Sequence, residues 1–306
     1  MKLIFATRPS KLARWQTQWV IRVLKEIHPG LECDEKVITT QGDKVLDKPL
    51  PEIGGKGLFT QELEGELLNG SVHCAVHSLK DLPVENPPGL TVGCIPDRAE
   101  VRDALISARG YTLLNLPEGA SVGTSSLRRA AQILSLRPDV KIQSLRGNVD
   151  TRLRKALEGQ YDAIILAGAG LMRLGLDSHV TEWLPLEVML PAPGQGALAV
   201  QCRADDEATL SLLAALENKP TRTSVTAERT FLRGLGGGCA VPVAAYATTS
   251  ERLSIINLTG LVISEGGKKV VKVTGQGTDA IELGQELARK AIREGADEIL
   301  SALMIG

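Results

Sequence analysis

A repeated alternation of apolar strand segments and amphipathic helices between residues 121 and 175 constrains the fold more than any other feature of the chain. SVGT, KIQSL and YDAIILAGAG are predicted strands. The helices between them are SSLRRAAQILSL, which begins with a serine, and NVDTRLRKALEG, capped by Asn148 or Asp150. YDAIILAGAG is apolar throughout, as in strands buried on both faces of a parallel sheet. This order predicts a doubly wound α/β domain.

The N-terminal third has a similar order. KLIFAT (2–7) is a predicted strand, residues 11–27 form a helix, and residues 34–40 alternate like a strand. A second helix starts near residue 58, and the strand SVHCAVHSL follows it. The loop 41–57 between them is rich in glycine, proline and charge, so we expect it to be mobile. The sequence therefore predicts a second α/β lobe.

The C-terminal part has a different pattern. The helix TSVTAERTFLRGL precedes three β-rich runs, and residues 279–304 form one long predicted helix. A helix, three strands and a helix indicate a small α+β domain with a three-stranded antiparallel sheet. MLPAPGQG (189–196) has two prolines and two glycines, which is typical of a linker or hinge. The predicted fold class is thus α/β, with two doubly wound lobes and this third domain.

Charge is distributed unevenly along the chain. The net charge is −1, which argues against general nucleic-acid binding, yet residues 121–175 hold nine Lys and Arg against four Asp and Glu. No apolar run is long enough to cross a membrane. The short apolar patch at the N-terminus does not resemble a signal peptide, so we expect a cytoplasmic protein. Five cysteines without a C-x-x-C pair indicate free thiols.

Cations and serines collect directly after the predicted strands, where doubly wound sheets bind ligands. The set comprises Arg8, Ser10, Ser126, Arg128, Arg129, Arg146, Arg152 and Arg173. A helix N-terminus is already positive, so several cations there make sense if an anion lies among them. Arginine binds carboxylates in a bidentate manner, which indicates a cleft for a polycarboxylate ligand. Lys80 and Asp81 follow SVHCAVHSL, and Asp81 could stabilise a cation or transfer a proton there.

Two further motifs invite chemical hypotheses. HCAVH (73–77) places two histidines four residues apart, but it lies in a predicted strand and lacks the glutamate of a zinc-protease motif, so we predict no metal site. GGGCAVPV (236–243) presents Cys239 after three glycines, which carry a large entropy cost on folding. The cysteine is either incidental or placed to meet a ligand.

Eight segments in one order resemble the porphobilinogen deaminase (hydroxymethylbilane synthase) family. They are ATRPSKLARWQ, GGKGLFTQELE, AVHSLKDLP, VGTSSLRRAAQ, LRGNVDTRL, YDAIILAGAGLMRLG, LPAPGQGALAVQCR and GGGCAVPV. The resemblance implies two lobes similar to type II periplasmic binding proteins and a small third domain. The implied boundaries are 1–96 with 197–216 returning to domain 1, 97–196 for domain 2, and 217–306 for domain 3.

The resemblance also implies an activity: four porphobilinogen molecules are condensed head to tail with loss of ammonia, and hydroxymethylbilane is released. The implied cofactor is a dipyrromethane held by a thioether to Cys239. Asp81 is the implied catalytic residue. Cofactor carboxylates are assigned to Lys80, Ser126, Arg128, Arg129 and Arg146, and substrate binding to Arg8, Ser10, Arg152, Arg173, Gln195 and Lys56 of the glycine-rich loop. The family further implies a monomer with no obligate protein partner.

The chain departs from the family pattern at Gly236, at His73-Cys74 and at Ala240. None of these positions is a proposed catalytic group. Two other hypotheses remain. A carboxylate receptor without catalysis would suit the two lobes alone, and a thiol enzyme would use Cys239 as a transient nucleophile. A covalent adduct of two pyrroles on Cys239 would distinguish the transferase from both the receptor and the thiol enzyme.

Overall fold

The computed structural model describes residues 2–44, 57–237, 241–250 and 255–305. The chain divides into two compact units: unit 1 is Met1–Ala99 with Ala197–Arg222, and unit 2 is Glu100–Gly196 with Thr223–Gly306. The chain therefore leaves unit 1 after residue 99 and returns to it at residue 197. Unit 2 contains two separate sheets, and the three-domain boundaries stay a prediction.

Unit 1 is built on a five-stranded mixed sheet in the order β2-β1-β3-β10-β4. Its strands are β1 (Lys2–Thr7), β2 (Glu32–Val37), β3 (Cys74–Ser78), β4 (Leu90–Cys94) and β10 (Leu198–Arg203). Strand β1 is parallel to β2 and β3, whereas β10 is antiparallel to β3 and β4. The carboxyl ends of β1, β2 and β3 consequently meet at one edge of the sheet.

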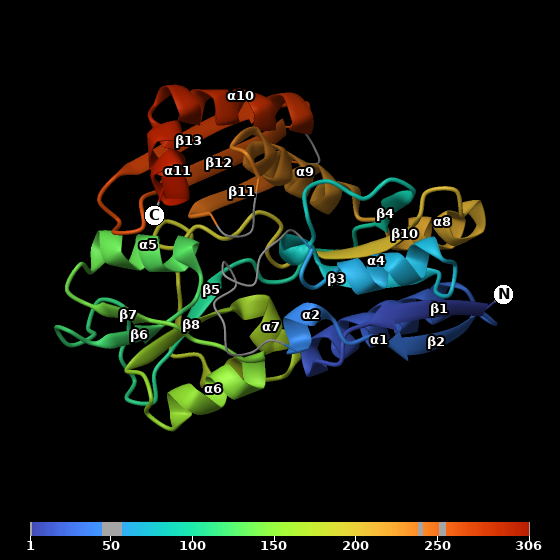
Figure 1. Ribbon diagram of the computed structural model, residues 1–306, viewed down its shortest axis with the longest axis horizontal. Helices are drawn as coiled ribbons and strands as arrows, with labels where there is room; N and C mark the ends of the chain where they lie inside the picture. Colours follow the sequence, from blue (N-terminus) through green and yellow to red (C-terminus); the bar gives the residue numbers. More distant parts are fainter. Residues whose placement is uncertain (1, 45–56, 238–240, 251–254, 306) are drawn as a thin grey trace. The chain divides into compact units, whose positions relative to one another are not determined.

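Several helices accompany this sheet in unit 1. They are α1 (Lys11–Ile27), α2 (Gln41–Lys44), α4 (Gln61–Leu68), α8 (Glu207–Leu213) and the 3-10 turns η1 (Leu79–Asp81) and η3 (Ala214–Leu216). Helix α1 lies against β1 (Figure 1), and its buried Val20 and Leu24 share a core with Leu3 and Phe5. These contacts hold α1 against the sheet directly after β1.

The first sheet of unit 2 has the order β7-β6-β8-β5-β9. Its strands are β5 (Asp103–Ile106), β6 (Ser121–Gly123), β7 (Lys141–Gln143), β8 (Ala163–Ala167) and β9 (Glu182–Trp183). Its helices are α5 (Leu127–Leu136), α6 (Val149–Leu157), α7 (Gly168–Arg173) and the 3-10 turn η2 (Asp177–His179). Strand β6 is parallel to both β7 and β8, so α5, α6 and α7 all follow carboxyl ends at the same sheet edge.

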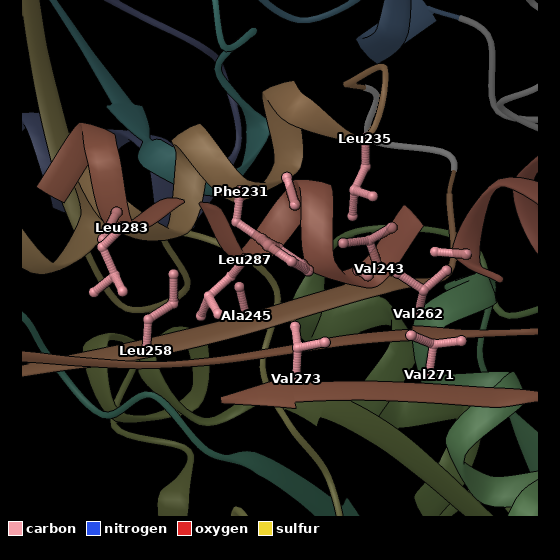
Figure 2. Close-up of a cluster of buried hydrophobic side chains, with 14 of the residues drawn as sticks. Phe231, Leu235, Val243, Ala245, Leu258, Val262, Val271, Val273, Leu283 and Leu287 are labelled. Carbon is pink, nitrogen blue, oxygen red and sulfur yellow. The ribbon is translucent and has the colours of Figure 1, made fainter. Parts of the chain in front are cut away.

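The second sheet of unit 2 is antiparallel, in the order β11-β12-β13. Its strands are β11 (Val243–Ser250), β12 (Ile255–Ile263) and β13 (Val270–Gly277), and its helices are α9 (Lys219–Gly234), α10 (Ala280–Arg293) and α11 (Ala296–Ile305). Phe231 of α9 and Leu287 of α10 pack with Ala245, Leu258 and Val273 of the strands (Figure 2). The predicted fold class is confirmed: two α/β sheets and one small α+β domain.

The prediction of one long helix over 279–304 is wrong. Helix α10 ends at Arg293 and α11 starts at Ala296. Gly295 between them has φ 99°, a left-handed conformation that favours glycine and ends a helix. The apolar spacing continues across the break because both helices bury residues in the same core.

Candidate active site

Arg8 follows the carboxyl end of β1, and its guanidinium is already held by an internal carboxylate. Its Nε donates to Asp43 Oδ2 of α2 at 3.2 Å, and it lies 4.1 Å from the centre of the Phe59 ring. Burial opposes ionisation of Asp43, but hydrogen bonds from Arg8 and Thr40 outweigh it, so the pKa of the carboxyl lies below its usual value. Ser10, two residues after Arg8, caps α1 by accepting the Ala13 N–H at 3.2 Å.

Asp81 ends η1, the turn directly after β3, and is exposed to solvent. Lys80 precedes it and is half-buried. The turn is anchored because Leu79 is buried and its N–H donates to the Ala197 carbonyl at 3.0 Å. Unit 1 therefore presents a carboxylate and a lysine at the same sheet edge as Arg8, on a turn whose backbone is fixed.

Arg128 and Arg129 lie in the first turn of α5 and share one buried carboxylate. Each donates an Nη2 hydrogen bond of 2.7 Å to Asp103, which is 0% exposed, and the arginines are 4% and 6% exposed. Burial lowers the pKa of Arg128, and Asp103 acts in the opposite direction. Ser126 caps the same helix by accepting the Arg129 N–H at 3.5 Å. The two guanidiniums are thus fixed from within the unit.

Asp103 is a site residue that sequence reasoning missed. It is the first residue of the apolar strand DALI, and an aspartate at the start of a buried strand needs a partner in the fold. The aspartate at the start of this apolar run was the sequence signal that could have identified it. Gln195 joins the same cluster: its Nε2 donates to Asp103 Oδ1 at 2.9 Å and to the Val101 carbonyl at 2.8 Å.

Three further arginines follow strands of the same sheet, and they differ in their partners. Arg152 donates from Nε to the Gly147 carbonyl at 2.7 Å. Arg146, after β7, is half-buried, and Arg173 closes α7. Within the described part of the chain, neither Arg146 nor Arg173 has a carboxylate within 4.0 Å, in contrast to Arg128 and Arg129.

The surroundings of Arg173 show whether the carboxyl-end edge of this sheet suits an anionic ligand. Burial lowers the pKa of its guanidinium to about 10, and the hydrogen bond found for it is to the Gly196 carbonyl at 2.7 Å. A cation removed from water is stabilised by a negative partner more strongly than an exposed cation would be. The donor set therefore fits a ligand that carries carboxylates, as a dipyrromethane with acetate and propionate side chains does.

Cys239 and Lys56 lie outside the described residues, and their roles stay predictions. The chain leading to Cys239 is described as far as Gly237, whose N–H donates to the Leu232 carbonyl at 3.0 Å. This bond closes the end of α9, and Gly237 has φ 55°. In the sequence, the cysteine therefore follows a helix terminus whose left-handed backbone favours glycine.

Gly237→Val is expected to lower the melting temperature by roughly 2–8 °C and to reduce the fraction of protein that carries the cofactor. A β-branched residue at positive φ is strained by about 1–2 kcal/mol or more, which loosens the terminus before Cys239. Differential scanning fluorimetry and intact-mass spectrometry measure the two effects. Gly266→Val is the control, because Gly266 is exposed, has no positive φ and has open space around it. Equal loading and melting in both variants would show that the glycine is only tolerated.

The histidines of HCAVH have structural environments. His73 Nδ1 accepts the Ile4 N–H at 3.1 Å. His77 is 6% exposed, and burial lowers its pKa to about 4, so it is neutral at physiological pH. In the part of the chain that the structure describes, no three histidine, cysteine or acidic side chains group as metal ligands.

Two family models match this chain. Residues 3–211 match the family described as porphobilinogen deaminase, dipyromethane cofactor binding domain, and residues 222–293 match porphobilinogen deaminase, C-terminal domain. The regulatory domain of a LysR family regulator from N. meningitidis is a structural neighbour at TM-score 0.40 and 13% identity, covering 70% of this chain and 91% of that chain.

Three curated relatives named porphobilinogen deaminase match nearly the whole chain. The Brevibacillus brevis protein is 51% identical over 97% of this chain and 96% of its own length. The Syntrophotalea carbinolica protein is 50% identical over 99% of this chain and 96% of its own length. The Staphylococcus aureus protein is 49% identical over 99% of this chain and 98% of its own length. The similarity thus includes every segment on which the resemblance was based.

Proposed function

The chain belongs to the porphobilinogen deaminase family, and from this premise we propose that Asp81 is its catalytic carboxylate and that arginines of both units bind carboxylates of substrate and cofactor. The enzyme is a transferase of tetrapyrrole (haem) biosynthesis. It condenses four porphobilinogen molecules head to tail with loss of ammonia and releases hydroxymethylbilane. Its dipyrromethane cofactor, when bound, supplies the primer to which the substrate units are added.

The observation that carries the site proposal is the pair Arg146 and Arg173, which lack a carboxylate partner among the described residues at a sheet edge where the other arginines are engaged internally. Porphobilinogen carries an acetate and a propionate, so each added unit brings two carboxylates. We assign Arg152 and Arg173 to substrate, and Ser126, Arg128, Arg129 and Arg146 with Lys80 to the cofactor.

Arg8 and Ser10 are assigned to substrate from unit 1. Asp43 occupies Arg8 in the structure described here, so a substrate carboxylate has to share or replace that partner. Phe59 beside the guanidinium limits its hydration. Lys56 precedes Phe59 by three residues and is assigned to the same ligand.

The placement of Asp81 at the end of η1 supports its proposed role. Its carboxylate oxygens can accept hydrogen bonds from pyrrole N–H groups and stabilise the positive charge that develops as ammonia leaves. The same oxygens can take the proton released when the new link forms. Exposure on an anchored turn leaves the carboxylate accessible, while the backbone of η1 keeps its position.

We place the enzyme in the cytoplasm. Cys74 and Cys202 are cross-strand neighbours of β3 and β10 and are free thiols, which suits a reducing compartment. None of the described helices is long and apolar enough to span a membrane. The proposed partner is the small-molecule substrate, with no nucleic acid and no obligate protein partner.

Arg146→Ala is expected to weaken binding of the cofactor and of the growing chain, which raises KM about tenfold or more. The melting temperature should change by less than about 2 °C, since a hydrogen bond to a charged group contributes roughly 1.5–3 kcal/mol and Arg146 has no internal carboxylate to lose. Steady-state kinetics and thermal unfolding give both values. Arg154→Ala removes an exposed arginine of α6 and is the matched control. Unfolding of the Arg146 variant alone would assign that arginine a structural role.

A further inference from the structure

Glu228 is a buried carboxylate with no part in the mechanism described above. It lies in α9 and is 0% exposed. Its Oε2 accepts the Gly194 N–H at 2.7 Å, and its Oε1 accepts the Ala247 N–H at 2.8 Å. Hydrogen bonds to an ionised acceptor are short and strong, especially away from water. One side chain therefore joins a helix, the 189–196 linker and a strand.

The linker covers the outer edge of β11. Strand β11 is at the end of its sheet, so its outward N–H groups need partners outside the sheet. Ala245 donates to the Pro191 carbonyl at 3.1 Å, and Ala247 donates to Glu228. The segment predicted as a linker or hinge is thus joined to β11 by one backbone hydrogen bond and, through the Glu228 carboxylate, by a second link.

The other side of the linker is held by the sheet that carries the arginines. Gln132 of α5 accepts the Leu190 N–H at 2.8 Å and donates to the Leu190 carbonyl at 3.1 Å. Gln195, only 1% exposed, donates to Asp103, which holds Arg128 and Arg129. A path of hydrogen bonds, with the Gly194–Gln195 peptide bond as one step, therefore leads from Glu228 of α9 through Asp103 to the arginine pair.

We propose that Glu228 is a positioning residue that fixes the C-terminal end of α9, the helix that precedes Cys239 in the chain, relative to Arg128 and Arg129. The proposal rests on the proposed function, in which Cys239 anchors the cofactor and these arginines bind its carboxylates. Helix α9 ends at Gly234, five residues before Cys239 in the sequence. Because α9 is tied to the linker near its middle, its end keeps one distance from the arginine pair. Gln195, which the resemblance assigned to substrate, is 1% exposed and donates to Asp103, so we assign it to this path instead.

Glu228→Gln tests the proposal, because the amide keeps the shape but presents a donor to one of the two N–H groups. We expect the adduct of two pyrroles to be retained by intact mass. We expect kcat to fall about 10- to 100-fold with KM within about twofold, since misplacement by about 1 Å can have effects of this size. The amide protons of Gly194 and Ala247 should exchange faster with deuterium by about tenfold or more.

Asp279→Ala is the matched control. Asp279 also accepts two backbone N–H bonds, both 2.8 Å, at the exposed start of α10 and away from the linker. If the Glu228 variant matches this control in kcat, KM and melting temperature, Glu228 is structural only and the proposal is overturned. A wild-type protein without the adduct would instead overturn the proposed function, so the two failures are distinguishable.

Gln195→Met tests the same path if the Glu228 variant does not fold. Methionine has nearly the same length but cannot donate to Asp103. The proposal expects a lower kcat, an unchanged KM and retained adduct. A higher KM with unchanged kcat would mean that Gln195 contacts substrate directly, and it would overturn the path.

Discussion

Cys239→Ser is expected to have the mass of its bare chain and no measurable turnover, whereas the wild-type protein should carry an addition equal to two linked pyrroles. A thiolate is a strong nucleophile near neutral pH and a serine hydroxyl is not, so the thioether cannot form. Cations near the thiol would increase its thiolate fraction. Intact-mass spectrometry of the purified proteins measures the addition directly.

Cys33→Ser is the control for the mass experiment, since Cys33 is the one cysteine among those described that is not buried. It should keep both the addition and the activity. An unmodified mass in fully active wild-type protein would remove the covalent cofactor assignment. An addition that persists in Cys239→Ser would place the anchor on another residue. A carboxylate receptor would show no addition in any variant.

Asp81→Asn is expected to lower kcat about 100-fold or more while keeping the fold and the adduct. The amide has the same shape but carries no negative charge and cannot take up a proton, so it loses both electrostatic stabilisation and general-base function. Asp81 is exposed, so its replacement should barely change the melting temperature. Single-turnover kinetics with porphobilinogen and intact mass measure the two expectations.

Glu85→Gln is the matched control for Asp81. It neutralises an exposed carboxylate four residues further along the same segment and should leave kcat within about twofold. Near wild-type turnover in Asp81→Asn would show that another group supplies the catalytic carboxylate. Loss of the adduct in that variant would assign Asp81 to cofactor assembly instead.

Whether a segment forms a helix or a strand was predictable where its apolar spacing was regular. The residues at which helices and strands begin and end were not predictable. YDAIILAGAG was predicted as one strand, yet β8 ends at Ala167 and α7 begins at Gly168. A run that is apolar at every position has no period, so it is compatible with either structure. The strands β4, β5 and β10 have no regular apolar spacing in the sequence. They pair with strands that are far away along the chain.

The candidate site was predictable as a set of residue types after strands, because the carboxyl ends of parallel strands collect at one edge. Its internal partners were not. Arg8 pairs with Asp43, 35 positions away, and Arg128 with Asp103, 25 positions away. Neither spacing is a period of a helix or a strand.

The sequence by itself determined the family, the fold class, the order of the site motifs and the excess of positive charge that indicated a polycarboxylate. Only the tertiary structure decided which cations are engaged internally, as Arg128 and Arg129 are by Asp103, and which have no carboxylate partner in the described chain, as with Arg146 and Arg173. It alone revealed Glu228 as the link between α9 and the linker. The physical reason is that burial and ion pairing depend on distances in space, which local sequence patterns do not encode.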